Sequence, residues 1–260
     1  MQKKIELNKM TSDQYLSDIV AEHKAPNLTY YDSRLTDVKN EIRNFAGGQL
    51  SEIKLSGSCV KKTALKGKAD CDLFISLKSN TSNSLSEIYS LLNTHFENAG
   101  YGTRKQNVSI GIKTKGLDID LVPGKIHSGY KNYHSLYLSK KDSWTKTNID
   151  LHIQNVNNTG RQNEIMLTKI WKDCHNLKFP SIYIELLVIH ALKYKNKGQL
   201  AKNFLTVLEY LRDSILITKF TDPANSNNII SNMIFKYQKE EIQKMAKNSL
   251  NEKYWEQIIW

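Results

Sequence analysis

Cysteines, long apolar segments and targeting signals are scarce in this 260-residue chain. Its three cysteines, Cys59, Cys71 and Cys174, are too few and too scattered for a disulfide framework. They include no Cys-x-x-Cys pair, so a structural zinc site is not expected. No apolar run approaches the roughly 18–20 residues that span a bilayer. The first residues also lack the apolar core of a secretory signal. We therefore expect a cytoplasmic protein that does not bind a membrane.

An excess of basic residues is the clearest property of the composition. Lysine and arginine number 37 against 26 aspartates and glutamates, which gives a net charge of +11. Such a surplus attracts polyanions and raises their encounter rate. Nucleotides, RNA and DNA all qualify, so charge alone does not choose among them. The length and the 40% hydrophobic content allow a substantial core.

Hydrophobic periodicity predicts helices at both ends of the chain and strands between them. One apolar stripe predicts a long helix over residues 28–45, which Gly47-Gly48 ends. The other predicted helices cover residues 11–23, 84–98, 161–175, 181–195, 199–217 and 228–250. Strands are predicted at residues 53–55, 73–77, 108–112 and 117–122. Pro123-Gly124 is expected to close the last strand.

This order of elements predicts an α+β protein with two lobes and a cleft between them. Residues 1–150 would hold the N-terminal helices and a lobe built on a mixed sheet, and residues 151–260 would form a helical C-terminal lobe.

Paired aspartates at the edge of a strand are the main chemical signal. Asp70 and Asp72 stand two residues apart where a strand begins, so both side chains point to one face. Asp120 lies on the neighbouring hairpin. Mg²⁺ prefers carboxylate oxygens and substrate phosphates, and two ions stabilise the attacking and leaving oxygens of an in-line displacement. We therefore expect Asp70, Asp72 and Asp120 to be catalytic and to hold two Mg²⁺ or Mn²⁺ ions, with Asp120 near the acceptor hydroxyl.

A glycine-serine turn precedes these aspartates. Gly57 lets the backbone approach a phosphate closely, and Ser58 and nearby N–H groups can donate to its oxygens. Thr63 is expected to brace this loop, and the lysines around it to act as point charges. No Gly-Lys-Ser/Thr opens a helix here, so the segment is not a Walker A loop.

Together these motifs resemble the polymerase-β-type nucleotidyltransferase superfamily. Within it, the pattern is similar to the branch of 2′-5′-oligoadenylate synthases, archaeal CCA-adding enzymes and bacterial cGAS/DncV-like nucleotidyltransferases (CD-NTases). The segments that carry the resemblance are 57–67, 70–75, 119–123, 169–172, 179–187 and 221–228.

The resemblance implies the two-lobed nucleotidyltransferase fold, with the carboxylates on the sheet. It also implies that Lys169 is the family's phosphate-gripping lysine and that Ser181 contacts the triphosphate, which suits a cation and a hydroxyl near a γ-phosphate. Gly57, Ser58 and Thr63 would complete the nucleotide site. The chain departs from the pattern at Lys62, where this loop often carries glycine.

Three products remain open for such an enzyme, which would consume NTPs, ATP among them, and release pyrophosphate. We favour a cyclic di- or trinucleotide made in bacterial antiphage signalling. The alternatives are a linear 2′-5′-oligoadenylate and the CCA end of tRNA or another RNA terminus. CCA-adding relatives generally carry further C-terminal domains, and the chain has no zinc-ribbon ligands.

A different class is an inactive nucleotide- or RNA-binding protein on the same fold. Three repelling carboxylates argue against it, because they cost stability unless a metal neutralises them. The resemblance leaves open whether a nucleic acid or a protein activates the enzyme, which we expect to be a monomer.

Overall fold

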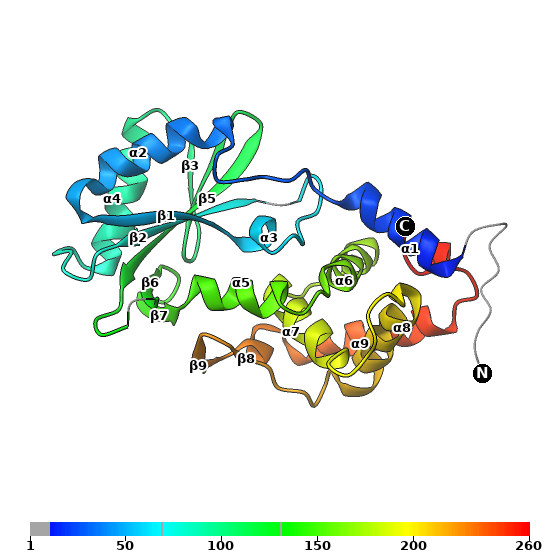
Figure 1. Ribbon diagram of the computed structural model, residues 1–260. Helices are drawn as coiled ribbons and strands as arrows, with labels where there is room; N and C mark the ends of the chain where they lie inside the picture. The colour runs from blue at the N-terminus through cyan, green and yellow to red at the C-terminus, as the bar shows by residue number, and fades with distance from the viewer. Residues whose placement is uncertain (1–10, 69, 131) are drawn as a thin grey trace. The chain divides into compact units, whose positions relative to one another are not determined.

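The computed structural model describes residues 11–68, 70–130 and 132–260. Contacts divide the chain into two compact units, Ala25–Gln154 and a second unit that joins Asn155–Trp260 to the chain up to Lys24 (Figure 1). The helix α1 (Ser12–His23) therefore packs with the C-terminal helices and not with the sheet. Its Tyr15 hydroxyl donates to the backbone oxygen of Ile259 at 2.9 Å. This differs from the expected division at residue 150, which placed every N-terminal helix with the sheet.

A mixed seven-stranded sheet forms the centre of the unit Ala25–Gln154 within the described residues (Figure 1). Its strands are β1 (Leu50–Ser56), β2 (Cys71–Leu77), β3 (Thr103–Lys105), β4 (Ile110–Thr114), β5 (Leu117–Ile126), β6 (His134–Leu138) and β7 (Ser143–Thr147). They are hydrogen-bonded in the order β1-β2-β5-β4-β3, and β6 extends from β5 and carries β7. The β2–β5 pair is parallel and the others are antiparallel. The expected mixed α+β class is confirmed.

Alternation along the strands gives the sheet two different faces. One face carries the main core, where Leu73 and Ile75 of β2 are buried in one cluster with residues of α2 (Thr36–Ala46) and α4 (Leu85–Asn98). The other face carries Asp72, Phe74 and Ser76 of the same strand. There Phe74 packs in a small separate cluster with Val122 and Leu136. We call the face that carries Asp72 and Ser76 the polar face. The main hydrophobic core lies on the opposite face of the sheet.

Short helices and turns complete the sheet unit. The helix α3 (Gly57–Val60) follows β1, and α5 (Ile149–Asn157) follows β7. Among the described residues, the 3₁₀ helices of this unit are η1 (Ser33–Leu35) and η2 (Gly47–Gln49), and those of the helical unit are η3 (Ile230–Met233) and η4 (Trp255–Gln257).

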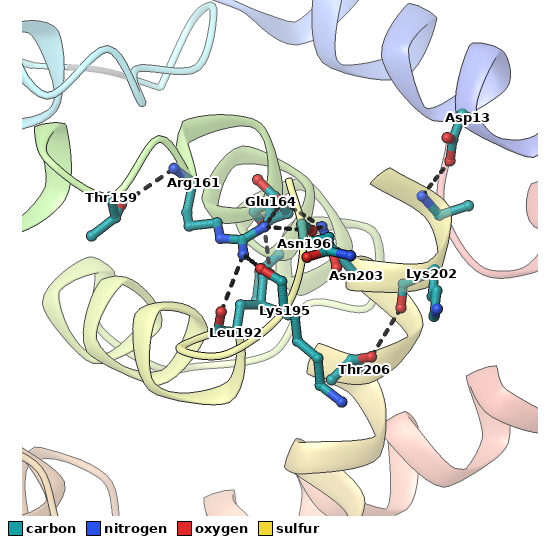
Figure 2. A network of polar contacts seen from close by, with 12 residues as sticks. Asp13, Thr159, Arg161, Glu164, Leu192, Lys195, Asn196, Lys202, Asn203 and Thr206 are labelled. Atoms are coloured by element: carbon teal, nitrogen blue, oxygen red, sulfur yellow. Dashed lines mark hydrogen bonds and ion pairs between the residues drawn. The ribbon is translucent and has the colours of Figure 1, made fainter. Parts of the chain in front are cut away.

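The helical unit is built mainly from apolar helix faces. Besides α1 it contains α6 (Gln162–Cys174), α7 (Ser181–Ala191), α8 (Leu200–Ser214) and α9 (Lys236–Asn251), with the hairpin β8 (Thr221–Asp222) and β9 (Asn225–Ile229). A buried polar network crosses this unit: Arg161 pairs with Glu164 at 2.9 Å, and Asn203 donates to the same carboxylate at 3.0 Å (Figure 2). Among the described residues no helix is long and apolar enough to cross a bilayer.

Three element predictions need correction. The long helix over residues 28–45 is wrong in its first part, because Asp32 caps the turn η1 by accepting from the Arg34 backbone N–H at 3.0 Å and α2 begins only at Thr36. The strand β5 does not stop at Pro123-Gly124 but continues to Ile126. Pairing with β4 ends at Leu121, so a proline without an N–H interrupts no ladder on that side. The last helix starts at Lys236, because residues 225–233 form β9 and η3.

Candidate active site

One row of directly opposed residues crosses the polar face of the sheet. Ser56 of β1 faces Asp72 of β2, and Asp72 faces Asp120 of β5. The row continues through Gly111 of β4 to Arg104 of β3. Neighbouring strands lie about 4.8 Å apart, so the register brings two carboxylates side by side between a hydroxyl and a guanidinium.

Gly57 brings the loop after β1 against Asp72. Its φ is +69°, and a Cβ atom at this position would lie 1.7 Å from Oδ2 of Asp72. The loop then closes on itself, because the Thr63 backbone N–H donates to the Ser58 oxygen at 3.0 Å. Thr63 is fully buried, and its role in bracing the loop stays a prediction. Lys62, the departure from the usual glycine, has a φ of +58°, the conformation that glycine adopts most easily.

The carboxylates are electrostatically strained. Burial and the neighbouring charges of Asp120 and Asp70 together raise the pKa of Asp72 to about 7, against the opposing charge of Lys61. Burial and the charge of Asp70 also raise the pKa of Asp120, against the influence of Arg104 and of hydrogen bonds from Ser109 and Gln106. Each negative charge therefore disfavours the next, and a cation would relieve the repulsion.

These residues fit a hard divalent cation by their chemistry. Asp72 and Asp120 offer carboxylate oxygens on one face, and the exposed Asp70 stands one residue before β2. In the part of the chain that the structure describes, no three His, Cys, Asp or Glu side chains already enclose an ion position. The fit rests on the donor type and on the repulsion between neighbouring carboxylates.

The remaining sequence candidates lie in the helical unit. Lys169 is in the middle of α6 and only 5% exposed, so it is not a surface lysine. Ser181 is the first residue of α7 and exposed, and Pro180 precedes it as the N-cap. Their roles toward a triphosphate stay a proposal.

Sequence reasoning missed the residues that surround Asp120. Gln106 donates from Nε2 to Oδ1 of Asp120 at 2.8 Å, and the Ser109 hydroxyl lies 3.4 Å from Oδ2. The nearby Gly111 carried a usable signal, since an isolated glycine between strand residues marks a close approach. Nothing in the local pattern pointed to Gln106, because its partner lies 14 residues further along the chain.

Comparison with known proteins places the fold. No protein-family model and no curated protein sequence matches the chain. Among the solved structures that match is CdnC of E. coli MS115-1 in a complex with HORMA-deltaN, at a TM-score of 0.71 and 18% identity, covering 91% of this chain and 88% of that one. The Elizabethkingia meningoseptica CdnE cyclic dinucleotide synthase with GTP and Apcpp matches at 0.72 and 15% identity, with coverage of 94% and 100%. The Bradyrhizobium diazoefficiens CD-NTase CdnG with GTP matches at 0.73 and 10% identity, with coverage of 92% and 90%.

At identities of this size the likeness shows the fold. The chain therefore has the nucleotidyltransferase fold of the solved CD-NTases, as the sequence motifs implied.

Proposed function

We propose that this chain is a metal-dependent nucleotidyltransferase that joins NTPs into a cyclic di- or trinucleotide and releases pyrophosphate. The observation that carries the proposal is the pairing of Asp72 with Asp120 on adjacent parallel strands, with the Gly57 loop resting against Asp72. The fold shared with solved cyclic-dinucleotide synthases supports it.

Each residue of the polar face has a separable role in this reaction. Asp70 and Asp72 would hold Mg²⁺ or Mn²⁺ together with the donor triphosphate, and Asp120 would share a second ion and orient the acceptor hydroxyl. When bound, such ions stabilise negative charge on phosphoryl oxygens. Gly57 and Ser58 would bring backbone N–H groups and a hydroxyl to the phosphates. The raised pKa of Asp120 suits a group that accepts a proton from the acceptor hydroxyl.

The helical unit would supply the remaining grip on the triphosphate. Lys169 carries a positive charge in a largely buried setting, and Ser181 offers an exposed hydroxyl at the start of α7. Replacing Lys169 by methionine keeps the apolar stem and removes the charge. We expect that variant to raise the KM for ATP more than it lowers kcat, and unchanged kinetics would remove Lys169 from the site.

The cellular role that fits this activity is antiphage signalling in the cytoplasm of a bacterium. One solved protein of this fold is in a complex with HORMA-deltaN, which supports including a protein activator among the partners to be tested beside nucleic acid. We propose a monomer as the catalytic form.

A product analysis tests the proposal. The full chain is incubated with four labelled NTPs and Mg²⁺ or Mn²⁺, without nucleic acid, and the mixture is treated with phosphatase before mass analysis. A phosphatase-resistant product without free ends is the expected result, and its mass identifies the bases. A linear product with free ends would point to an oligoadenylate synthase. Transfer only to added tRNA would point to a terminal RNA nucleotidyltransferase. No product with NTPs alone, with double-stranded RNA or tRNA, or with a HORMA protein added as activator would contradict the assignment as an enzyme.

Two asparagine variants make this assay specific to the site. Asp72→Asn is expected to abolish product. Asp118→Asn is the matched control, because Asp118 lies two residues before Asp120 on the same strand but pairs with Lys113 at 3.3 Å near the surface. Equal activity of the two variants would contradict the metal assignment.

A further inference from the structure

The carboxylate of Asp120 is held by the side chain of Gln106, which reaches it from the turn between β3 and β4. Nε2 of Gln106 donates to Oδ1 of Asp120 at 2.8 Å. The Ser109 hydroxyl lies 3.2 Å from Oε1 of Gln106 and 3.4 Å from Oδ2 of Asp120. The amide is thereby oriented from its other end, so that its NH₂ group faces the carboxylate.

Gly111 provides the space for this contact. A Cβ atom on Gly111 would lie 2.9 Å from Nε2 of Gln106 and 3.2 Å from Oδ1 of Asp120. The φ of Gly111 is not in the left-handed region, so an alanine suits the strand backbone. Any Cβ here would instead crowd the end of the Gln106 side chain and Nη2 of Arg104, which would lie 3.0 Å away, and would push the Gln106 amide from Asp120. The glycine therefore serves the side-chain contact and not the backbone conformation.

The turn that carries Gln106 is itself fixed. The Tyr89 hydroxyl of α4 lies 2.5 Å from the backbone oxygen of Gln106 and 3.2 Å from that of Ser109. The Ser139 hydroxyl donates to the Gln106 oxygen at 2.8 Å. The backbone of Gln106 is thus tied to a core helix and to a second loop, and the contact with Ser109 orients its amide.

A neutral amide suits this position better than a cation would. One N–H donor occupies one of about four lone-pair positions on a carboxylate. It leaves the charge and the other positions for a metal ion, whereas a bidentate guanidinium would neutralise the group. Partners that orient metal ligands in this way typically account for about 10- to 100-fold in metal affinity or activity.

We propose that Gln106 is a positioning residue that orients the Asp120 carboxylate for binding a divalent cation. The absence of a side chain at Gly111 leaves the space that this contact needs. The inference rests on the proposed function for the identity of Asp120 as a metal ligand. It adds a second group of residues, on β4 and on the β3–β4 turn, that is specific to the acceptor side of the site.

Mn²⁺ binding to the full chain tests this without turnover. Binding is followed by electron paramagnetic resonance in the presence of an ATP analogue with a methylene group between its α- and β-phosphates. Gln106→Ala and Gly111→Ala are compared with Asp120→Asn and with Gly102→Ala. The last is a matched control, because a Cβ at Gly102 meets nothing within 4 Å.

We expect Gln106→Ala and Gly111→Ala to weaken Mn²⁺ binding about 10- to 100-fold, with melting temperatures within a few degrees of wild type. In the turnover assay, kcat should fall in both variants while the KM for ATP changes little, because Gln106 contacts the carboxylate and not the donor nucleotide. Gly102→Ala should match wild type throughout.

The outcomes separate this inference from the proposed function. If Asp120→Asn weakens Mn²⁺ binding but Gln106→Ala and Gly111→Ala do not, the positioning role is overturned and the function stands. If all three weaken binding but the product is not cyclic, the positioning role stands and the product assignment fails. If Asp120→Asn leaves Mn²⁺ binding unchanged, Asp120 is not a metal ligand and the positioning role is overturned, while the product analysis decides the proposed function separately.

Discussion

The backbone of Gly57 rests against the carboxylate of Asp72, at a position where a Cβ atom would lie 1.7 Å from Oδ2. Glycine is required there for two reasons: a side chain would clash with Asp72, and the φ of +69° is costly for other residues. Gly67 in the same loop separates the two requirements. Its φ is +71°, but a Cβ there would meet nothing within 4 Å.

Gly57→Ala should therefore abolish the proposed product formation, while Gly67→Ala should only destabilise the fold. Both alanines would hold the left-handed conformation at a cost of about 1–2 kcal/mol. Gly57→Ala adds the clash with Asp72, so its urea midpoint should fall at least as far as that of Gly67→Ala. Only Gly57→Ala displaces Asp72, and a displacement of about 1 Å in such a site costs on the order of 100-fold in rate. Product formation by both variants measures the difference. Equal residual activity would show that the contact with Asp72 does not matter.

Asp72→Asn should stabilise the metal-free protein as it removes activity. Burial and the charges of Asp120 and Asp70 raise the pKa of Asp72 to about 7, so its ionised form is unfavourable in the fold. An amide keeps the shape without the charge, and the melting temperature in EDTA at pH 8 should rise by several degrees. Excess Mn²⁺ should reduce the difference in melting temperature between Asp72→Asn and wild type, because it binds the wild-type carboxylate more strongly than the amide. A variant that melts below wild type in EDTA would show that the fold itself satisfies this charge.

The sequence predicted the position of those residues and elements that a local pattern of spacing or hydrophobicity marks. The two-residue spacing of Asp70 and Asp72 before a buried strand was enough to expect them on one face. The strand after them, the hairpin that carries Asp120 and the helix over residues 84–98 are confirmed because each shows a clear apolar period. The sharpest failure was the start of α2. There the apolar spacing continued through Leu28 and Tyr31, but the cap at Asp32 decided where the helix begins.

The contacts around Asp120 could not be predicted in the same way. They depend on which strands become neighbours, since Asp120 faces Gly111 on one side and Asp72, 48 positions earlier, on the other. Strand register is set by packing across the whole sheet, not by the residues of one strand. Gln106 reaches Asp120 only once that register exists.

Acid should destabilise the sheet unit partly through His134. This buried residue lies 2.7 Å from the Ser76 hydroxyl through Nε2 and edge-on to Phe74. Burial lowers its pKa below the usual 6.5. Lys54 adds to the effect, and Glu52, Asp150 and the Asn132 backbone oppose it. Below pH 6.5 the unfolded chain therefore binds a proton that the folded chain does not, so stability falls as the pH drops toward the lower folded pKa.

His134→Gln should flatten this dependence, although it also lowers stability at pH 8. The free energy of unfolding, measured in urea at several pH values between 8 and 5, gives the slope. Ser76→Ala is the control, because it removes the hydroxyl and keeps the buried imidazole, so the steep slope should remain. A slope in His134→Gln as steep as in wild type would assign the acid sensitivity to other groups.

The buried Arg161–Glu164 pair should contribute far more to stability than the Arg212–Asp213 pair, although their N–O distances are 2.9 and 2.6 Å. The Arg161 and Glu164 side chains are only 5% and 6% exposed, and the guanidinium also donates to backbone oxygens of the loop after α7, including that of Leu192 at 3.1 Å (Figure 2).

Arg161→Ala leaves a buried carboxylate without its cation, which costs roughly 3–5 kcal/mol. The exposed pair should contribute little, because solvent and salt screen its charges. Arg161→Lys should fall between them, because a single ammonium keeps the charge but cannot span the same acceptors. Urea denaturation of the three variants, with Arg212→Ala as the exposed control, measures these losses. Equal losses for Arg161→Ala and Arg212→Ala would show that this network does not hold the helical unit together.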